Sequence, residues 1–157
     1  MLMERNKIIH AINERFTEMS TETILFHQAV ADILGFHITD HRCMHFLHTY
    51  GAMPAGRLAE LTGLTTPAVT GIIDRLENRG YVRRTNDPKD RRRTIVEPIP
   101  NNKLEKKLEE IFTPFHEKMH KLLTSYSDSE LAFLLDVMNK SIELTRGESK
   151  KFRALQR

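Results

Sequence analysis

The sequence contains a single cysteine, Cys43, and no long hydrophobic run. One cysteine excludes an internal disulfide and any zinc site that needs two or more cysteine ligands from one chain. This cysteine usage fits a reducing cytoplasm, where we expect the protein to act. No apolar stretch approaches the roughly 18 residues of a membrane span. Residues 1–12 mix charged and apolar side chains too often for a signal peptide, so we expect no membrane partner.

Motifs for catalysis are also lacking. The sequence has no nucleophile with a base at motif spacing, no glycine-rich phosphate loop and no pair of carboxylates placed for acid–base chemistry. We therefore expect neither an enzyme nor a bound cofactor.

Positive charge is concentrated in one part of the chain. The formal net charge of the 157 residues is +3. Residues 51–98 hold nine Lys/Arg and six Asp/Glu, whereas the remaining residues hold fifteen of each. All of the excess lies in this part, as expected of a module that contacts a polyanion such as DNA.

The same part has the pattern of a helix-turn-helix followed by a β-hairpin. Pro54 suits the first turn of a helix, and Gly63 suits a tight turn. Thr65 or Thr66 is placed to cap a second helix, which ends at Gly80. Residues 81–85 and 94–97 predict two strands joined by a basic turn.

The second helix of this pattern turns short side chains outward. Its predicted inner face is Val69, Ile72, Ile73 and Leu76, and its outer face is Thr66, Ala68, Thr70, Gly71, Asp74 and Arg75. A helix with such short outer side chains can enter the DNA major groove. The arginines of the following turn suit the minor groove, where the potential is negative.

Long helices are predicted on both sides. One apolar stripe runs from Glu4 to Leu34 at steps of three and four residues: Ile8, Ile12, Phe16, Met19, Thr23, Phe26, Val30 and Ile33. Thr39 is placed to cap the next helix, which Gly51 closes. A further stripe runs from Leu104 to Leu122, where we expect Pro114 to kink or restart the helix. Ser127–Glu130 is a capping box that starts the last helix, and we expect the polar tail from residue 147 to fray or to extend it loosely.

Two histidine pairs leave two interpretations open. His41/His45 and His116/His120 are each spaced four residues apart, so each pair can share a metal ion. Asp40 is the acidic side chain at helical spacing from the first pair. We favour solvated or pocket-lining histidines over ligands and assign no metal site.

Four motifs resemble the MarR family of bacterial transcription regulators. They are LAELTGL (58–64), AVTGIIDRLE (68–77), GYVRR (80–84) and DPKDRRR (87–93), and the similarity spans nearly the whole chain. The resemblance implies a mainly α fold with a small β-wing, in which a winged helix-turn-helix is flanked by long dimerisation helices. It implies the divisions 1–36 (N-terminal dimerisation helix), 37–98 (DNA-binding region) and 99–157 (C-terminal dimerisation helices). It also implies a homodimer on double-stranded DNA with a pseudo-palindromic operator, most often as a repressor, and in many members release by a small-molecule effector.

The family's site residues carry over by position. Thr65, Thr66, Ala68, Thr70 and Gly71 would lie at or near base edges, and Arg75 would contact a phosphate or a base edge. The wing signature, Asp followed two residues later by Arg, falls on Asp90 and Arg92; Arg92 would enter the minor groove and Asp90 would brace it. Backbone contacts would come from Arg83, Arg84, Arg91 and Arg93. The effector pocket would lie near Phe26, His37, His41, Met44, His45 and Phe115.

Sensor branches of the family match less well. The peroxide-sensing cysteine of some members lies in the first helix, whereas Cys43 falls in the second. Asp40-His41 and His116/His120 are similar to the ligands of a zinc-sensing branch, although the second pair lies about two turns too far along its helix. A zinc-responsive regulator of the same fold is one alternative, and a helical interaction module without DNA binding is another. A gel-shift assay separates the last from a DNA-binding protein.

Overall fold

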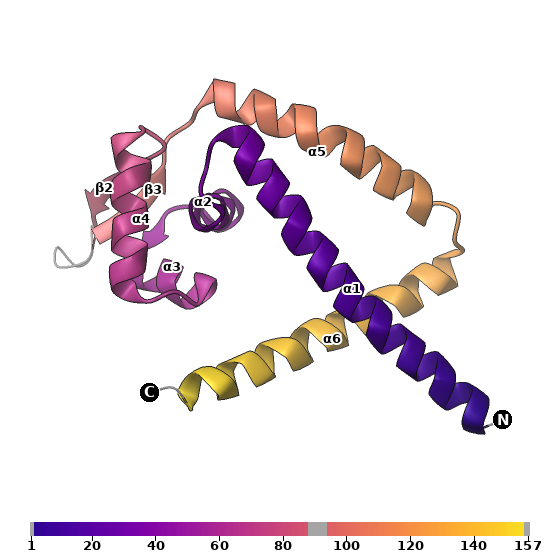
Figure 1. The fold of residues 1–157 in the computed structure, drawn as a ribbon. Coiled ribbons are helices and arrows are strands. Elements are labelled where there is room, and N and C mark those ends of the chain that lie inside the picture. The colour runs from indigo at the N-terminus through magenta and orange to yellow at the C-terminus, as the bar shows by residue number, and fades with distance from the viewer. Residues whose placement is uncertain (1, 88–93, 156–157) are drawn as a thin grey trace. The chain divides into compact units, whose positions relative to one another are not determined.

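In the computed structural model the chain is mainly helical with one small sheet, and the structure describes residues 2–87 and 94–155. The elements in order are α1 (Leu2–Leu34), α2 (Ile38–Tyr50), β1 (Met53–Pro54), α3 (Ala55–Thr62), α4 (Thr66–Asn78), β2 (Val82–Asn86), β3 (Thr94–Pro98), α5 (Asn102–Leu123) and α6 (Asp128–Ala154) (Figure 1). The predicted fold class, mainly α with a small β-wing, is confirmed. The chain forms two compact units, Met1–Lys107 and Leu108–Arg157.

The first unit holds the buried core of the described chain. Its fully buried side chains come from the end of α1, from α2, from the two helices of the helix-turn-helix and from the sheet: Val30, Cys43, Leu47, Leu58, Val69, Ile73, Leu76, Val82 and Val96. The four inward positions predicted for the second helix of the motif are all buried. Burial of this apolar surface, at about 25 cal/mol per Å², fixes α4 against α2 and α3.

The sheet contains one strand that the sequence pattern did not predict. β2 and β3 form the expected antiparallel hairpin, with Val82 opposite Pro98 and Asn86 opposite Thr94. The short β1 pairs with the other edge of β3, Met53 opposite Val96, so the strand order is β1-β3-β2. This pairing joins the segment before α3 to the hairpin, and α4 runs alongside β2 (Figure 1).

The corner of the helix-turn-helix depends on Gly63. This residue has φ 73° and ψ 14°, in the left-handed region that favours glycine. Its N–H donates to the carbonyl oxygen of Ala59 at 2.8 Å, and the Thr62 hydroxyl donates to the Leu58 carbonyl oxygen at 2.7 Å. The turn therefore satisfies the last carbonyls of α3 locally, as expected at a helix end.

The structure corrects one local expectation, the cap of α2, and narrows two others. The residue before α2 is His37, with no side-chain capping bond, while Thr39 lies inside the helix and its hydroxyl is 3.4 Å from an Asp40 carboxylate oxygen. Of the two outcomes expected at Pro114, a restart does not occur, because α5 continues through this residue. The polar tail extends the last helix as far as Ala154, which is one of the two outcomes expected for it.

Long apolar stripes remain uncovered in the described chain. On α1, the side chains of Ile8, Ile12, Phe16 and Met19 are about half exposed or more. In the second unit, α6 has no buried residue, although the predicted capping box of Ser127 and Glu130 forms at its start. Across the described residues, no helix combines the length and apolar character needed to cross a membrane.

Candidate nucleic-acid interface

The start of α4 is built by local capping. The Thr65 side chain accepts a hydrogen bond from the N–H of Ala68 at 3.4 Å, so Thr65, and not Thr66, is the N-cap. Pro67 follows in the first turn, where a missing N–H costs nothing. The helix therefore begins where three exposed short side chains follow one another: Thr65, Thr66 and Ala68.

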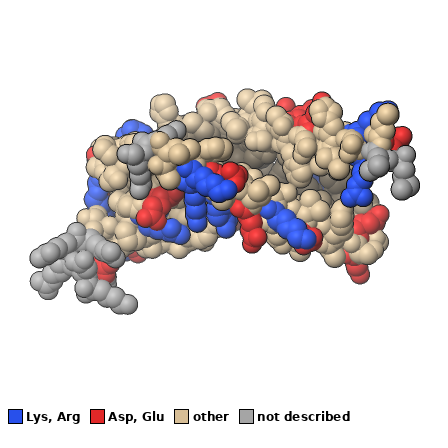
Figure 2. Space-filling view, turned by 90° about the horizontal axis from the view of Figure 1, so that it is seen from below, with Lys and Arg blue, Asp and Glu red and all other residues tan. Residues whose placement is uncertain are grey.

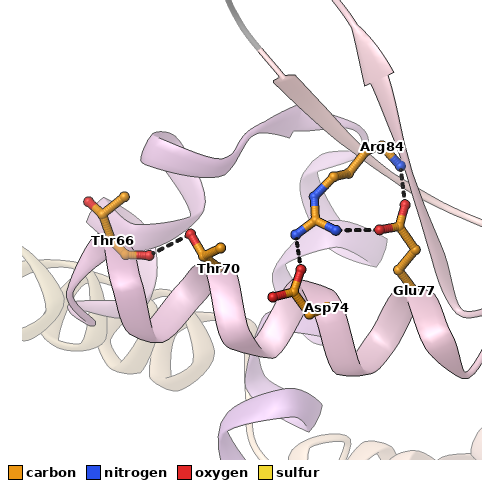
Figure 3. A network of polar contacts seen from close by, with 5 residues as sticks. All are labelled: Thr66, Thr70, Asp74, Glu77 and Arg84. Atoms are coloured by element: carbon orange, nitrogen blue, oxygen red, sulfur yellow. Dashed lines mark hydrogen bonds and ion pairs between the residues drawn. The ribbon is translucent and has the colours of Figure 1, made fainter.

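Thr70 continues this exposed surface one turn later. Its hydroxyl donates to the carbonyl oxygen of Thr66 at 3.0 Å (Figure 3). The hydroxyl proton is thus already used, and the oxygen of this exposed side chain can act only as an acceptor, through its two lone pairs. Thr70 can accept a hydrogen bond from the amino group of adenine or cytosine, and its methyl group can contact thymine.

Arg75 is held by a carboxylate from another helix. Its Nη2 donates to Oδ1 of Asp40 at 2.6 Å and its Nε donates to Oδ2 at 3.2 Å. These hydrogen bonds raise the pKa of the Arg75 guanidinium. The Asp40 side chain is 3% exposed, and the Arg75 side chain is 50% exposed. The predicted DNA contact is therefore oriented by α2 while part of it still faces solvent.

Arg84 joins the wing to α4. It is paired with Asp74 at 2.5 Å and also with Glu77, and its backbone N–H donates to Glu77 Oε1 at 2.9 Å (Figure 3). Both carboxylates lie on α4, whereas Arg84 lies on β2. The single charge of Arg84 thus offsets part of the negative charge of Asp74 and Glu77, which would otherwise repel phosphate.

The other described arginines near the motif also have partners, either a carboxylate or a backbone carbonyl oxygen. Arg83 donates to Glu97 across the hairpin at 2.8 Å, and Arg57 pairs with Glu60 at 2.8 Å. Arg79 donates to the Gly35 carbonyl oxygen at 2.8 Å, with its guanidinium 4.6 Å from the ring centre of Phe36. All five arginines between residues 51 and 87 therefore have partners inside the protein.

The unbalanced positive charge falls on residues 88–93. This segment contains Lys89, Arg91, Arg92 and Arg93 against the single acid Asp90, which equals the excess of the whole chain. The predicted wing residues Asp90, Arg91, Arg92 and Arg93 lie outside the described residues. On the face drawn in Figure 2, the described Lys and Arg side chains lie among Asp and Glu side chains.

A histidine cluster forms between α1 and α2. The ring of His27 lies 5.7 Å from that of His41 and 6.4 Å from that of His45, between ring centres. Burial, with the nearby His27 and His45, lowers the pKa of His41 to about 4. Burial and the charge of Asp40 raise the pKa of the fully buried Cys43 thiol to about 11, which is the environment of an inert cysteine.

The predicted effector-pocket residues are only partly gathered by the first unit. His41 and Met44 are buried, the exposed His45 lies beside them on α2, and Phe26 packs its ring against His27 at 5.6 Å. His37 instead lines a separate pocket with Gln28, Asp32 and Phe36. Phe115 and the pair His116/His120 belong to the second unit. Among residues 2–87 and 94–155, no group of three or more His, Cys, Asp or Glu side chains is arranged to hold a metal ion.

Sequence reasoning missed three participants. Asp40 was considered only as a possible metal ligand beside His41, Glu77 only as part of a motif, and His27 was not singled out. A local signal exists for Glu77, because Arg84 follows it by only seven residues, on the strand after the helix. The Asp40–Arg75 pair joins residues 35 positions apart, so only the tertiary packing brings them together.

Comparisons with known proteins agree with this geometry. The sequence profile of the MarR family matches residues 36–94. YcgE, an uncharacterised HTH-type transcriptional regulator of Bacillus subtilis (strain 168), is 35% identical over 149 residues, 95% of this chain and 96% of the relative. A MarR family protein from Bacillus stearothermophilus has a similar fold, with a TM-score of 0.69 at 16% identity over 90% of this chain and 97% of that chain. NadR in complex with 4-hydroxyphenylacetate has a TM-score of 0.61 at 22% identity over 82% of this chain and 90% of that chain.

Proposed function

Because the chain belongs to the MarR family of DNA-binding transcription regulators, we propose that it binds a pseudo-palindromic operator as a homodimer in the cytoplasm and represses transcription there. The divisions of the proposal are a DNA-binding region at 37–98 with dimerisation helices at 1–36 and 99–157. In this proposal each copy supplies one recognition helix, α4. The pairing of two copies sets the distance between half-sites at about one helical turn of DNA or a multiple.

One observation supports the DNA-binding surface above all others. The first two turns of α4 expose short side chains, while the arginines of α4 and β2 are paired within the protein. In our proposal Thr65, Thr66, Ala68, Thr70 and Gly71 read base edges with a contribution from Arg75. The arginines of the wing supply most of the attraction to phosphates, with Arg92 in the minor groove and Asp90 bracing it.

This division of labour revises the proposed roles of Arg83 and Arg84. Both were expected to add contacts to the DNA backbone. Their ion pairs with Glu97 and with Asp74 and Glu77 favour a smaller contribution to phosphate binding, because a guanidinium already neutralised by a carboxylate releases fewer counterions from DNA. Arg91, Arg92 and Arg93 are the main phosphate contacts in the proposal.

The test is the salt dependence of binding to a duplex selected from a random pool by the wild-type protein. Arg92→Ala should weaken binding and lower the slope of log affinity against log salt by about one. Arg83→Ala, the matched control, should change the slope by much less. Circular dichroism and thermal melting confirm that both variants fold. An unchanged affinity of Arg92→Ala at moderate salt rejects the wing assignment.

A small-molecule effector is the second part of the proposal. NadR, which shares the fold, is known in complex with a phenolic acid, 4-hydroxyphenylacetate, and this chain has a half-buried aromatic and histidine cluster between α1 and α2. We place the effector at this cluster, near Phe26, His41, Met44 and His45. Thermal-shift screening with small aromatic acids tests this placement, and the expected hit loses its effect in His41→Ala. Stabilisation by zinc that His41→Ala abolishes would favour the zinc-responsive alternative instead.

A further inference from the structure

The first turn of α2 carries a buried acidic residue whose main partner lies on α4, the proposed recognition helix. Asp40 is 2% exposed, and its carboxylate accepts two hydrogen bonds from Arg75 on α4. The Thr39 hydroxyl, 3.4 Å from Oδ1, is a weaker third donor. Within the described residues, Asp40 is the one acidic side chain that is buried.

A buried carboxylate keeps its charge only if a cation and hydrogen bonds replace the lost water. The guanidinium of Arg75 does this with two parallel N–H groups, an arrangement that restricts the plane of the guanidinium as well as its distance. A lysine could offer the charge but not the planar fork. The pair therefore restricts the direction in which Arg75 can point.

The remaining edge of Arg75 is available for a ligand. Half of its side chain is exposed, and two of its five N–H donors are used by Asp40. Nη1 lies 3.9 Å from the position that a Cβ on Gly71 would take. This guanidinium nitrogen thus lies over the turn of α4 that carries Thr70 and Gly71, two of the proposed base-reading positions.

We propose that Asp40 is a positioning residue for DNA recognition, holding Arg75 in the orientation from which its free edge contacts the operator. The inference rests on the proposed function, because it requires α4 to be the recognition helix. It assigns Asp40 a role in selectivity that its burial would otherwise conceal. It also makes the first turn of α2, which carries His41 of the histidine cluster, an immediate neighbour of the DNA-contacting apparatus.

The experiment compares affinity for the selected duplex with affinity for random duplex of the same length, in the full chain. Asp40→Asn should lower affinity for the selected duplex about tenfold while leaving the random duplex within about twofold. Asp32→Asn is the matched control, because it removes one negative charge from an exposed position on α1. The Asp32 carboxylate accepts a hydrogen bond from Gln28, also on α1, at 2.9 Å. This variant should leave the ratio of the two affinities unchanged.

A double-mutant cycle separates positioning from a merely structural role. In the Arg75→Ala background, Asp40→Asn should have no further effect on the ratio of the two affinities, because Asp40 acts through Arg75. If Asp40→Asn keeps the wild-type ratio, or lowers it equally with and without Arg75, the inference is overturned. Should Asp40→Asn fail to fold, Arg75→Lys tests the same point, since it keeps the charge but loses the fork. A wild-type chain that selects no duplex at all would reject the proposed function itself.

Discussion

Individual side chains in the first unit have environments that change their chemistry. His41 is 7% exposed and lies near two other imidazoles. Thr70 has its hydroxyl proton committed to the backbone. Neither property can be read from the residue type, since both depend on what surrounds the side chain.

The pKa of His41 predicts a pH dependence of stability. The unfolded chain binds a proton at this residue near pH 6.5, whereas the folded chain binds it only near pH 4. The contribution of His41 to the free energy of unfolding is therefore complete above about pH 6.5. It is lost as the pH falls towards 4, and the total loss is about 3 kcal/mol. Urea denaturation across this range measures it.

The readout is the slope of unfolding free energy against pH. His41→Gln should flatten that slope between pH 6.5 and 4, whatever its stability at neutral pH. His48→Gln, which changes an exposed histidine of the same helix, should keep the wild-type slope. Identical slopes for wild type and His41→Gln would contradict the assigned environment.

Thr70→Val tests base reading by a single hydroxyl. The substitution keeps the shape of the side chain and removes its hydrogen-bond acceptor. The difference in binding free energy between the bases at one operator position should therefore change by about 1 kcal/mol or more. Affinity for random duplex should change little. Thr124→Val is the control, because the Thr124 hydroxyl also bonds a local carbonyl oxygen but lies in the second unit. Uniform weakening across all duplexes would show that Thr70 does not read bases.

At the scale of elements, helix and strand positions followed from periodicity and turn chemistry. The inner face of α4, the glycine corner at Gly63 and the capping box of Ser127 and Glu130 are local patterns, and all three were predicted correctly. β1 was missed because two residues are too few for any period, and their pairing with β3 is set by tertiary packing. The ion pairs of Arg75 and Arg84 were missed because tertiary packing also sets them.

The start of α6 provides a stability prediction for one element. The Ser127 side chain accepts from the Glu130 N–H, and Glu130 accepts from the Ser127 N–H at 2.8 Å. Ser127→Ala should lower the free energy of unfolding by about 1 kcal/mol. Ser149→Ala, near the other end of the same helix, should cost less than about 0.5 kcal/mol. Chemical denaturation of both variants measures the difference, and equal losses would mean that the cap contributes nothing specific.

At the scale of the whole molecule, the apolar faces of α1 and α6 exceed what one copy covers. Ile8, Phe16 and Met19 on α1, and Leu135 and Ile142 on α6, are all 45% exposed or more. Large exposed apolar surfaces usually mark an interaction site. This pattern supports the proposed homodimer, in which a second copy covers these faces.

The dimer proposal predicts that stability depends on concentration. Because association stabilises the folded state, Tm should rise with protein concentration. Phe16→Glu places a charge in the apolar face of α1 and should shift the protein towards monomer in sedimentation velocity. Asn13→Glu adds the same charge at an exposed polar position of α1 and should leave the dimer intact. A wild-type protein that sediments as a monomer at all concentrations would reject the proposal.

The two halves of α4 differ in a way that bears on how such a protein could acquire a new target. In the first two turns, up to Gly71, the exposed side chains of the helix do not hold it to other elements of the described chain. In the second half, Asp74, Arg75 and Glu77 form ion pairs that join the helix to α2 and β2. Under the proposed function, substitutions at Thr66, Ala68 and Thr70 would therefore alter the preferred operator while the contacts that hold α4 against α2 and β2 stay in place. Such a protein could acquire a new target by changes at these three positions alone.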